Sequence, residues 1–177
     1  MAEAPTLLLV VDVQNGFVNE HTRHVIEPVN GLIHAFADRG APVAFTRFVN
    51  VKGGGHERWI GWRRFMEEPE NALHDGLETD DHPVFVKHGY TAFTEEFEEH
   101  LRVLGIERLV ICGIATDGCV LKTAVDAFER DIEPVVVTDA CASHAGEAVH
   151  EAGLLLLGRF IGKGQLKKSR GSDPLDL

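Results

Sequence analysis

The stretch Gly113-Ile114-Ala115-Thr116-Asp117-Gly118-Cys119-Val120 decides the fold of this chain. It follows Leu109-Val110-Ile111, an apolar, β-branched run that predicts a buried parallel strand. Apolar residues then recur at helical spacing, which predicts a helix over residues 121–130. Cys119 therefore lies on a turn from a strand into a helix. In an open α/β sheet, ligands bind in the crevice beyond the carboxyl ends of the strands, so this turn is a candidate site.

Cys119 has two interpretations. Most free cysteines are small buried hydrophobic residues without a chemical role. A thiol in the first turn of a helix, however, faces backbone N–H groups and the positive end of the macrodipole, and both favour the thiolate that attacks carbon. Gly113 and Gly118 allow the backbone to turn tightly around Cys119, which favours the second interpretation. A reactive cysteine would then need a base and a cation from neighbouring strand ends.

The length and composition predict a single globular domain with an acidic surface. The chain has 177 residues, 44% of them hydrophobic, so we expect one domain over residues 1–177, less ordered from about residue 163. The net charge of −11 argues against nucleic-acid and membrane partners and would attract a cationic substrate. The three cysteines lack disulfide-like spacing, and the first residues do not resemble a signal peptide. We therefore expect a cytoplasmic protein.

A carboxylate interrupts the first apolar run of the chain. Residues 6–13, Thr-Leu-Leu-Leu-Val-Val-Asp-Val, predict a central parallel strand with Asp12 near its carboxyl end. A buried acid is costly unless it is hydrogen-bonded or paired. Asp12 could simply cap the turn through Gln14-Asn15-Gly16, because Asp and Asn favour turns. The alternative is a carboxylate placed over the active edge of the sheet.

Lys87 ends another predicted strand, residues 83–87. A lysine at a strand end is most often a solvated surface charge. Here, however, it joins Asp12 and Cys119 as a third charged or nucleophilic group at the carboxyl end of a predicted strand. That coincidence makes Lys87 a candidate for the cation that a reactive cysteine needs.

The rest of the chain continues a regular alternation of strands and helices. The additional predicted elements are strands over 41–48 and 133–138 and helices over 28–39, 94–104 and 145–160. This order predicts a three-layer α/β/α sandwich with a mostly parallel, Rossmann-like sheet. Because carboxyl ends of parallel strands share one edge of the sheet, Asp12, Lys87 and Cys119 are expected to point into one crevice.

Residues 49–81 lack clear periodicity. A segment this long without regular structure inside a small domain is usually functional. Its two tryptophans, Trp59 and Trp62, could be packing anchors, walls of a substrate pocket or part of an oligomer interface. Gly53-Gly54-Gly55 is a hinge candidate and does not match a phosphate-binding loop. We expect this segment to determine specificity.

Three motifs occur in the order and spacing of one protein family. They are Leu-Leu-Val-Val-Asp-Val-Gln-Asn-Gly-Phe at 8–17, Val-Lys-His-Gly-Tyr-Thr-Ala-Phe at 86–93, and Gly-Ile-Ala-Thr-Asp-Gly-Cys-Val at 113–120. With Asp139-Ala140 downstream, they cover nearly the whole chain. On these motifs the sequence resembles the isochorismatase-like cysteine hydrolase superfamily, in its amidase branch. The resemblance implies a six-stranded, mainly parallel sheet flanked by helices.

The resemblance also implies a catalytic triad of Asp12, Lys87 and Cys119 and a cis peptide between Ile114 and Ala115. Backbone N–H groups of Ala115 and Cys119 would form the oxyanion hole. In this scheme the Lys87 cation lowers the pKa of Cys119, and Asp12 takes the thiol proton. The thiolate attacks an amide carbonyl, and water hydrolyses the resulting thioester.

Departures from family patterns narrow the chemistry. The resemblance implies that isochorismatases proper, which cleave a vinyl ether, lack the cysteine, so Cys119 indicates an amidase. Nicotinamidases typically carry an Asp-x-His metal motif after the second strand, whereas this chain has Thr-Arg-Phe-Val-Asn at 46–50. The stretch Asp80-Asp81-His82 lies at the wrong end of a strand and is a weak metal candidate. We therefore expect no metal and no other cofactor.

Several other residues are assigned from their positions alone. As pocket walls we expect Gln14, Phe17, Trp59, Trp62 and Tyr90, each of which could equally be simple packing. Cys112 and Cys141 are expected to be buried and inert, and His144 and His150 to pack at the surface or against site residues without a role in proton transfer.

The sequence leaves three function classes. The first is a cofactor-free hydrolase that cleaves a C–N bond of a small amide, lactam or ureido compound. The second is a hydrolase of another bond, such as an ester or a vinyl ether, on the same scaffold. The third is a non-catalytic binding or scaffold protein, which the intact set of Asp12, Lys87 and Cys119 argues against. We further expect a homo-oligomer, either a dimer or a tetramer, and a small-molecule partner that could be cationic.

Overall fold

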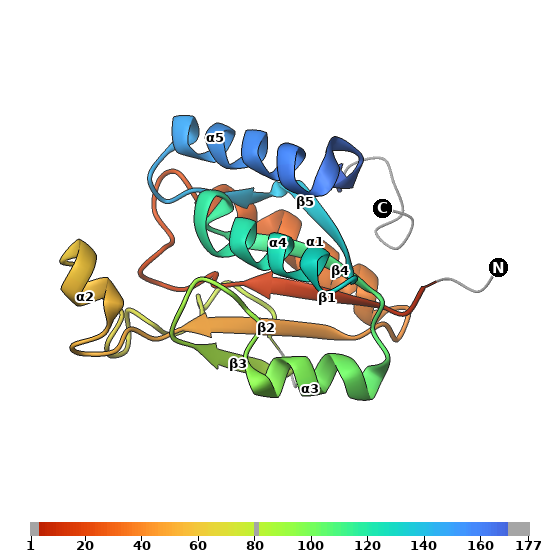
Figure 1. Cartoon of the computed structure of the whole chain (residues 1–177), viewed down its shortest axis with the longest axis horizontal. Helices are drawn as coiled ribbons and strands as arrows, with labels where there is room; N and C mark the ends of the chain where they lie inside the picture. Colours follow the sequence, from red (N-terminus) through yellow and green to blue (C-terminus); the bar gives the residue numbers. More distant parts are fainter. Residues whose placement is uncertain (1–3, 80–81, 170–177) are drawn as a thin grey trace.

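One parallel sheet forms the centre of the molecule (Figure 1). The computed structural model describes residues 4–79 and 82–169. Six strands pair in the order β3-β2-β1-β4-β5-β6, and every pair among these strands is parallel. The strands are β1 (Thr6–Val11), β2 (Val43–Phe48), β3 (Val84–Lys87), β4 (Arg108–Ile114), β5 (Glu133–Ala142) and β6 (Leu166–Lys167). The predicted three-layer α/β/α class is confirmed.

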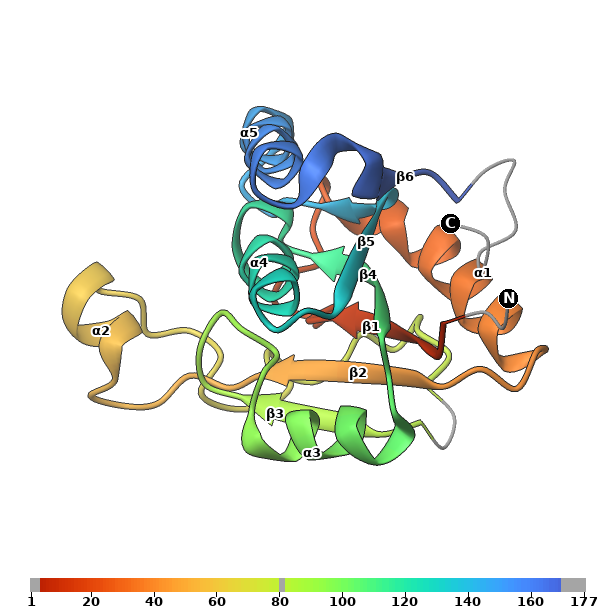
Figure 2. The same cartoon turned by 45° about the vertical axis from the view of Figure 1, so that its right-hand side comes forward.

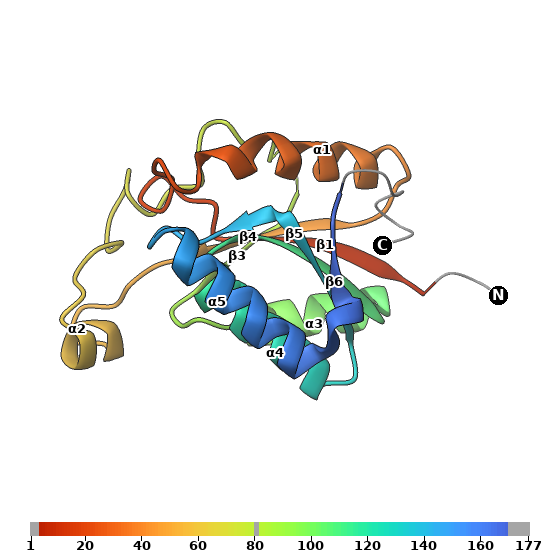
Figure 3. The same ribbon diagram turned by 90° about the horizontal axis from the view of Figure 1, so that it is seen from above.

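Helices cover both faces of the sheet. Figure 3 shows α1 along one face and α3, α4 and α5 along the other. The α-helices are α1 (Ile26–Ala37), α2 (Gly55–Ile60), α3 (Glu95–Leu104), α4 (Leu121–Glu129) and α5 (Glu147–Leu157). Short 3-10 turns occur at Arg23–Val25 and Lys163–Gln165, and π-helical turns at Thr116–Val120 and Gly158–Gly162. No helix among the described residues is long and apolar enough to span a bilayer.

Local sequence signals explain several of these boundaries. The Thr94 side chain caps α3 by accepting a hydrogen bond from the Phe97 N–H at 3.3 Å. Gly105 ends the same helix in the left-handed region, with a φ of 63°. Residues 7–11 of β1 are fully buried, which their continuous apolar run predicts for a strand covered on both faces.

The order of the strands places a crevice between β1 and β4. From β1 the chain proceeds to β2 and β3 on one side, whereas β4, β5 and β6 lie on the other. Connections therefore run in opposite directions from β1 and β4, and the crevice between their carboxyl ends is the expected ligand site. Gly113 allows the two strands to approach here: its φ is 117°, and a Cβ at this position would lie 2.1 Å from the Val11 carbonyl oxygen.

The structure differs from the sequence prediction in several segments, including residues 49–81, where α2 forms in a stretch without predicted regular structure. Strand β5 continues to Ala142 rather than ending near residue 138, and α5 ends at Leu157 before a π-helical turn. Residues 163–169 are not a frayed tail, because Leu166–Lys167 pair with β5 as β6, which Figure 2 shows at the edge of the sheet. The rest of that predicted tail, residues 170–177, lies outside the described residues.

Candidate active site

Three strand ends bring Asp12, Lys87 and Cys119 together. Asp12 follows β1, Lys87 is the last residue of β3, and Cys119 lies in the π-helical turn after β4. The Lys87 Nζ lies 2.7 Å from the Asp12 Oδ2 and donates to the Cys119 Sγ at 3.3 Å. Asp12 is fully buried, and Lys87 and Cys119 are 1% and 7% exposed. The predicted convergence in one crevice is therefore confirmed.

The Lys87 ammonium contacts four polar groups. It donates to the carbonyl oxygens of Gly89 at 2.9 Å and Tyr90 at 3.2 Å, in addition to its contacts with Asp12 and Cys119. Burial alone would lower the pKa of Lys87, but the nearby Asp12 and Cys119 raise it above its ordinary value. Lys87 is therefore a permanent cation between a carboxylate and a sulfur atom, and not the solvated surface charge that its residue type favours.

The Cys119 thiol is protonated in this environment. Burial raises its pKa, the negative charge of Asp12 raises it further, and the opposing effect of Lys87 is smaller. Lys87 does lower the pKa of Cys119, as expected from the sequence, through its charge and its hydrogen bond to the sulfur. The net shift is nevertheless upward, because burial and the Asp12 carboxylate together outweigh Lys87. The peptide bond between Ile114 and Ala115 is cis, as the resemblance implies.

Thr46 of β2 orients the Asp12 carboxylate. Its hydroxyl donates to the Asp12 Oδ1 at 2.7 Å and accepts from the Asp12 backbone N–H at 3.2 Å. Asp12 lies in the left-handed region with a φ of 47°, a conformation that Asp tolerates better than most residues. Thr46 was not a candidate from the sequence, although its central position in a predicted strand beside Asp12 was a usable signal.

A cavity of about 330 Å³ opens above Cys119. Its walls come from the segments that follow β1, β3, β4 and β5 and from residues 48–62. The lining residues are Phe17, Phe48, His56, Ile60, Trp62, Tyr90, Ala115, Asp117, Gly118, Cys119 and His144. The predicted pocket walls Phe17, Trp62 and Tyr90 are thus part of it, whereas Gln14 and Trp59 are not.

Gln14 holds loops together below the cavity. Its side-chain amide donates to the Phe48 carbonyl at 2.8 Å and the Asn71 carbonyl at 2.6 Å, and its Oε1 accepts from the Phe48 N–H at 2.9 Å. The side chain is fully buried. The prediction of Gln14 as a pocket wall is wrong, because these backbone groups use its amide completely.

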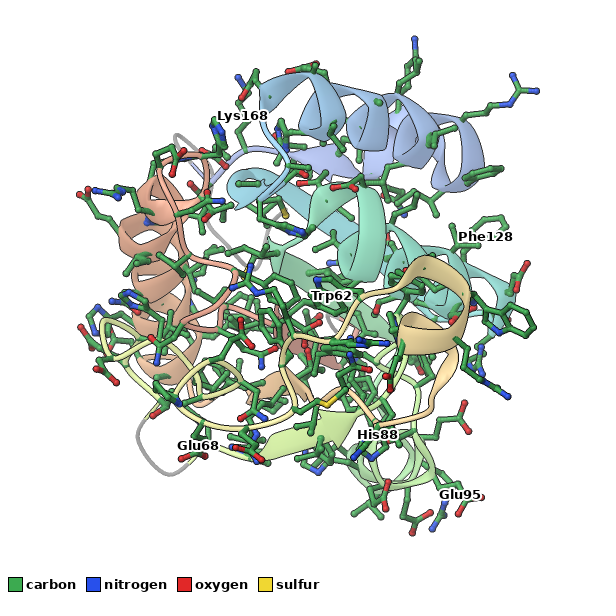
Figure 4. The ribbon with its side chains drawn as sticks, turned by 90° about the vertical axis from the view of Figure 1, so that its left-hand side faces the viewer. Trp62, Glu68, His88, Glu95, Phe128 and Lys168 are labelled. Atoms are coloured by element: carbon green, nitrogen blue, oxygen red, sulfur yellow. The ribbon has the colours of Figure 1, made fainter. Side chains whose placement is uncertain are left out.

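Trp59 does not line the cavity and is 79% exposed. Helix α2 ends at Ile60, and Gly61 reverses the chain with a φ of 67°, so Trp62 returns toward the body of the molecule. There its ring stacks between Phe17 and Phe48, at centroid distances of 6.1 and 5.7 Å. Figure 4 shows Trp62 near the middle of the face on which α2 lies. A pocket role for Trp59 is therefore wrong, and an interface role stays a prediction.

Two histidines line the cavity, and one of them, His56, was not a candidate from the sequence. His56, on α2, lies 4.9 Å from the Phe48 ring and 5.2 Å from the Tyr90 ring. His144 is exposed and packs at the rim with its ring 4.9 Å from Phe17, in agreement with the expected packing at the surface or against site residues. Burial and then Lys87 lower the pKa of His56; burial lowers the pKa of His144, although the charge of Asp117 opposes this shift. Both rings are therefore neutral at pH 7.

The cavity donors do not form a metal site. Among the described residues, the group of three ligand-type side chains that converges within 4.8 Å is Glu147, His150 and Glu151 on α5, outside the cavity lining. Asn50, at the end of the stretch where nicotinamidases carry their motif, donates to the carbonyls of Trp62 and Arg64 at 3.0 Å each. The weak candidate Asp80-Asp81 lies outside the described residues. These residues therefore do not fit the metal centre of that branch.

Known proteins share this fold and sequence pattern. The model of the isochorismatase domain family matches residues 6–161. The chain is 30% identical to the uncharacterized isochorismatase family protein YwoC of Bacillus subtilis, with 89% of this chain and 88% of YwoC covered. It is 28% identical to the ureidoacrylate amidohydrolase RutB of Methylobacterium radiotolerans, with 90% and 75% covered. N-carbamoylsarcosine amidase from Thermoplasma acidophilum has the same fold, with a TM-score of 0.82 at 24% identity over 95% of this chain and 98% of that one. The chain belongs to the isochorismatase family of hydrolases.

Proposed function

We propose that the protein hydrolyses a C–N bond of a small amide, lactam or ureido compound through a thioester on Cys119. One observation carries the proposal: the Lys87 ammonium contacts both the Asp12 carboxylate and the Cys119 sulfur. The similarity to a ureidoacrylate amidohydrolase supports the bond type. Because Cys119 lines the cavity, a small amide bound there could bring its carbonyl carbon to the sulfur.

The position of Lys87 lowers the free-energy cost of moving a proton from the Cys119 sulfur to the Asp12 carboxylate. The thiol proton moves to Asp12, which becomes neutral while Cys119 becomes a thiolate. Lys87 then exchanges one anionic neighbour for another without moving, since it lies 2.7 Å from the carboxylate and 3.3 Å from the sulfur. The buried site thus holds one cation and one anion before and after the step. This explains how a thiol with a raised pKa can still act as the nucleophile.

Acylation then follows from the groups around the sulfur. The thiolate forms a bond to the amide carbon, and the carbonyl π electrons move to oxygen. The backbone N–H groups of Ala115 and Cys119 are the proposed donors to this oxyanion. When the tetrahedral intermediate collapses, the C–N bond breaks and protonated Asp12 gives its proton to the departing nitrogen. The products of this half-reaction are an amine, or ammonia, and the Cys119 thioester.

Water completes the cycle. Asp12, again a carboxylate, takes a proton from a water molecule whose oxygen attacks the thioester carbon. Collapse of the second tetrahedral intermediate breaks the C–S bond and releases a carboxylic acid from an amide or lactam, or, from a ureido compound, a carbamic acid that breaks down to CO₂ and an amine or ammonia. The proton on Asp12 returns to the Cys119 thiolate. The overall reaction consumes one water molecule per amide and restores the thiol.

The experiment is an amine-release assay on small primary amides, lactams and ureido compounds. Cys119→Ala is expected to reduce turnover to background while its circular dichroism stays unchanged. Cys112→Ala is the matched control, because Cys112 is fully buried in β4 and does not line the cavity. Acid quenching of the wild type with a slow substrate should leave the acyl mass on the peptide that contains Cys119.

The assay also separates the alternatives. An ester or vinyl ether that turns over while no amide does would favour hydrolysis of another bond. No turnover of any compound, with a Cys119 that forms no acyl adduct, would favour a non-catalytic binding protein. Full activity in Cys119→Ala would contradict the proposed mechanism directly.

A further inference from the structure

The charged groups of the cavity leave one uncompensated negative charge. Asp12 and Lys87 do not line the cavity; they form an ion pair next to the Cys119 sulfur, in which the two charges cancel, and the Cys119 thiol is neutral. The rings of His56 and His144 are neutral at pH 7, because their surroundings lower both pKa values. Asp117 is then the lining residue whose formal charge is not balanced within the cavity.

No ion pair joins Asp117 to another described residue. Its Oδ1 is buried and accepts no hydrogen bond from the described part of the chain. The described lining residues include no arginine and no lysine. Lys87 contacts the Cys119 sulfur but does not itself line the cavity. The nearby Arg64 is already paired with the Glu70 carboxylate at 2.5 Å. Asp117 therefore presents an uncompensated carboxylate two positions before the nucleophile in the same turn.

Aromatic rings form most of the remaining wall. Phe17, Phe48, Trp62 and Tyr90 surround the space above Cys119. Their faces carry partial negative charge, and a cation within about 6 Å of such a ring is attracted to it. The Lys87 ammonium already lies 5.5 Å from the centroid of the Phe48 ring, and aromatic rings of this kind also bind substituted ammonium groups of ligands. A carboxylate-bearing ligand would meet repulsion from Asp117, and the described residues that line the cavity include no lysine or arginine to pair with it.

We infer that the cavity selects small amides whose non-reacting end carries a compact cation, such as a protonated or quaternary ammonium group. The inference rests on the proposed amide hydrolysis and adds the substrate class. In this arrangement the carbonyl lies at Cys119, and the cation lies between Asp117 and the aromatic wall. The cavity of about 330 Å³ accommodates a small molecule of this kind. The net charge of −11 draws cations toward the protein as a whole.

The test compares amides of equal shape and different charge. Trimethylammonio-acetamide is cationic, tert-butylacetamide is its neutral carbon isostere, and malonamate carries a carboxylate. We expect the kcat/KM of the cationic amide to exceed that of the isostere by roughly ten- to thirty-fold, the range of a desolvated cation–π site. Malonamate is expected to be the poorest substrate. The same reasoning predicts poor turnover of a ureidoacrylate, which also carries a carboxylate.

Two variants test whether Asp117 causes the preference for cationic amides. Asp117→Asn is expected to reduce the ratio of cationic to neutral kcat/KM several-fold. Glu147→Gln removes one negative charge from an exposed position of α5 outside the lining, and it should keep the wild-type ratio. A ratio near one in the wild type, or a ratio that Asp117→Asn and Glu147→Gln change equally, would overturn the inference while leaving amide hydrolysis in place.

A binding measurement is independent of turnover. Choline and its neutral carbon isostere are compared for their ability to slow labelling of Cys119 by iodoacetamide. Protection by choline at about tenfold lower concentration, lost in Asp117→Asn, would support the cation site even if no amide is hydrolysed. In that case the proposed function fails and the charge preference stands. Equal protection by both compounds would contradict the inference.

Discussion

The backbone of Gly153 in α5 lies directly against the backbone of Asp117. A Cβ at Gly153 would be 2.8 Å from the Asp117 nitrogen and 2.9 Å from its Cα, closer than real Cβ atoms approach. Helix α5 therefore supports the turn that carries Cys119, and a glycine that weakens the helix is needed for the close approach. The two elements must shift together if this position acquires a side chain.

Gly153→Ala is accordingly expected to destabilise the protein by about 1–3 kcal/mol, as overpacking does, and to lower kcat because the turn with Cys119 moves. Gly31→Ala is the matched control: Gly31 also lies in a helix, but a methyl group there would meet nothing within 4 Å. That variant should stabilise by about 0.5–1 kcal/mol and keep full activity. Urea unfolding and steady-state kinetics measure both effects. Equal stabilisation by the two variants would contradict the packing argument.

Lys87 is expected to be essential for folding stability as well as for chemistry. Lys87→Met leaves the fully buried Asp12 carboxylate without its cation, which costs about 3–5 kcal/mol for a pair of this kind. The double variant Asp12→Asn with Lys87→Met should recover much of that loss, although it is inactive. Arg102→Ala breaks an exposed pair with Glu99 and should leave the urea midpoint unchanged. A single variant Lys87→Met as stable as Arg102→Ala would show that the buried pair contributes little.

Chelators are expected to leave turnover unchanged. The ligand-type side chains of the cavity, including His56, His144 and Asp117, do not converge as a group of three within 4.8 Å among the described residues. Activity is measured after dialysis against EDTA and after addition of zinc or magnesium. Loss of activity that one of these metals restores would contradict this expectation.

The sequence was sufficient to predict that the three catalytic candidates meet, because each lies at the carboxyl end of a predicted strand, whether the strand is buried like β1 and β4 or partly exposed like β3. Asp12, Lys87 and Cys119 come after apolar runs whose direction and order place their ends on one edge of the sheet. The helix boundaries of α3 were predictable for a similar reason, since Thr94 and Gly105 are local capping signals. These features depend on residues next to one another in the chain.

The cavity walls could not be predicted in the same way. His56 enters the cavity from α2, a helix of six residues with no buried side chain and hence no apolar periodicity to read. Trp59 and Trp62 look equivalent in sequence, but the left-handed Gly61 between them sends one outward and the other inward. The pKa of Cys119 was misjudged because it depends on a balance of burial, Asp12 and Lys87, and the neighbouring charges alone do not show which of these dominates.

The balance of burial, Asp12 and Lys87 predicts that removal of the Asp12 charge makes the Cys119 thiol more reactive toward iodoacetamide. Because burial and the Asp12 charge raise the pKa of Cys119, Asp12→Asn is expected to lower it. Lys87 would then have the Cys119 thiolate as its anionic neighbour, at the 3.3 Å contact already present. Each pKa unit by which the value falls gives about tenfold more thiolate at neutral pH. The variant should therefore react faster with iodoacetamide at pH 7 than the wild type, although it hydrolyses no amide.

Labelling rates from about pH 6 to 10, followed by peptide mapping, measure the effect. The wild-type rate at Cys119 should still rise at the alkaline end, since a raised pKa keeps the thiol protonated over this range, whereas the Asp12→Asn rate should level off at lower pH. Cys112 and Cys141 are buried and do not line the cavity, so they serve as internal controls that label only after unfolding in urea. Slower labelling of Asp12→Asn than of the wild type at every pH would mean that Asp12 already draws the proton from Cys119 in the unliganded enzyme, and the proton transfer would then precede substrate binding instead of following it.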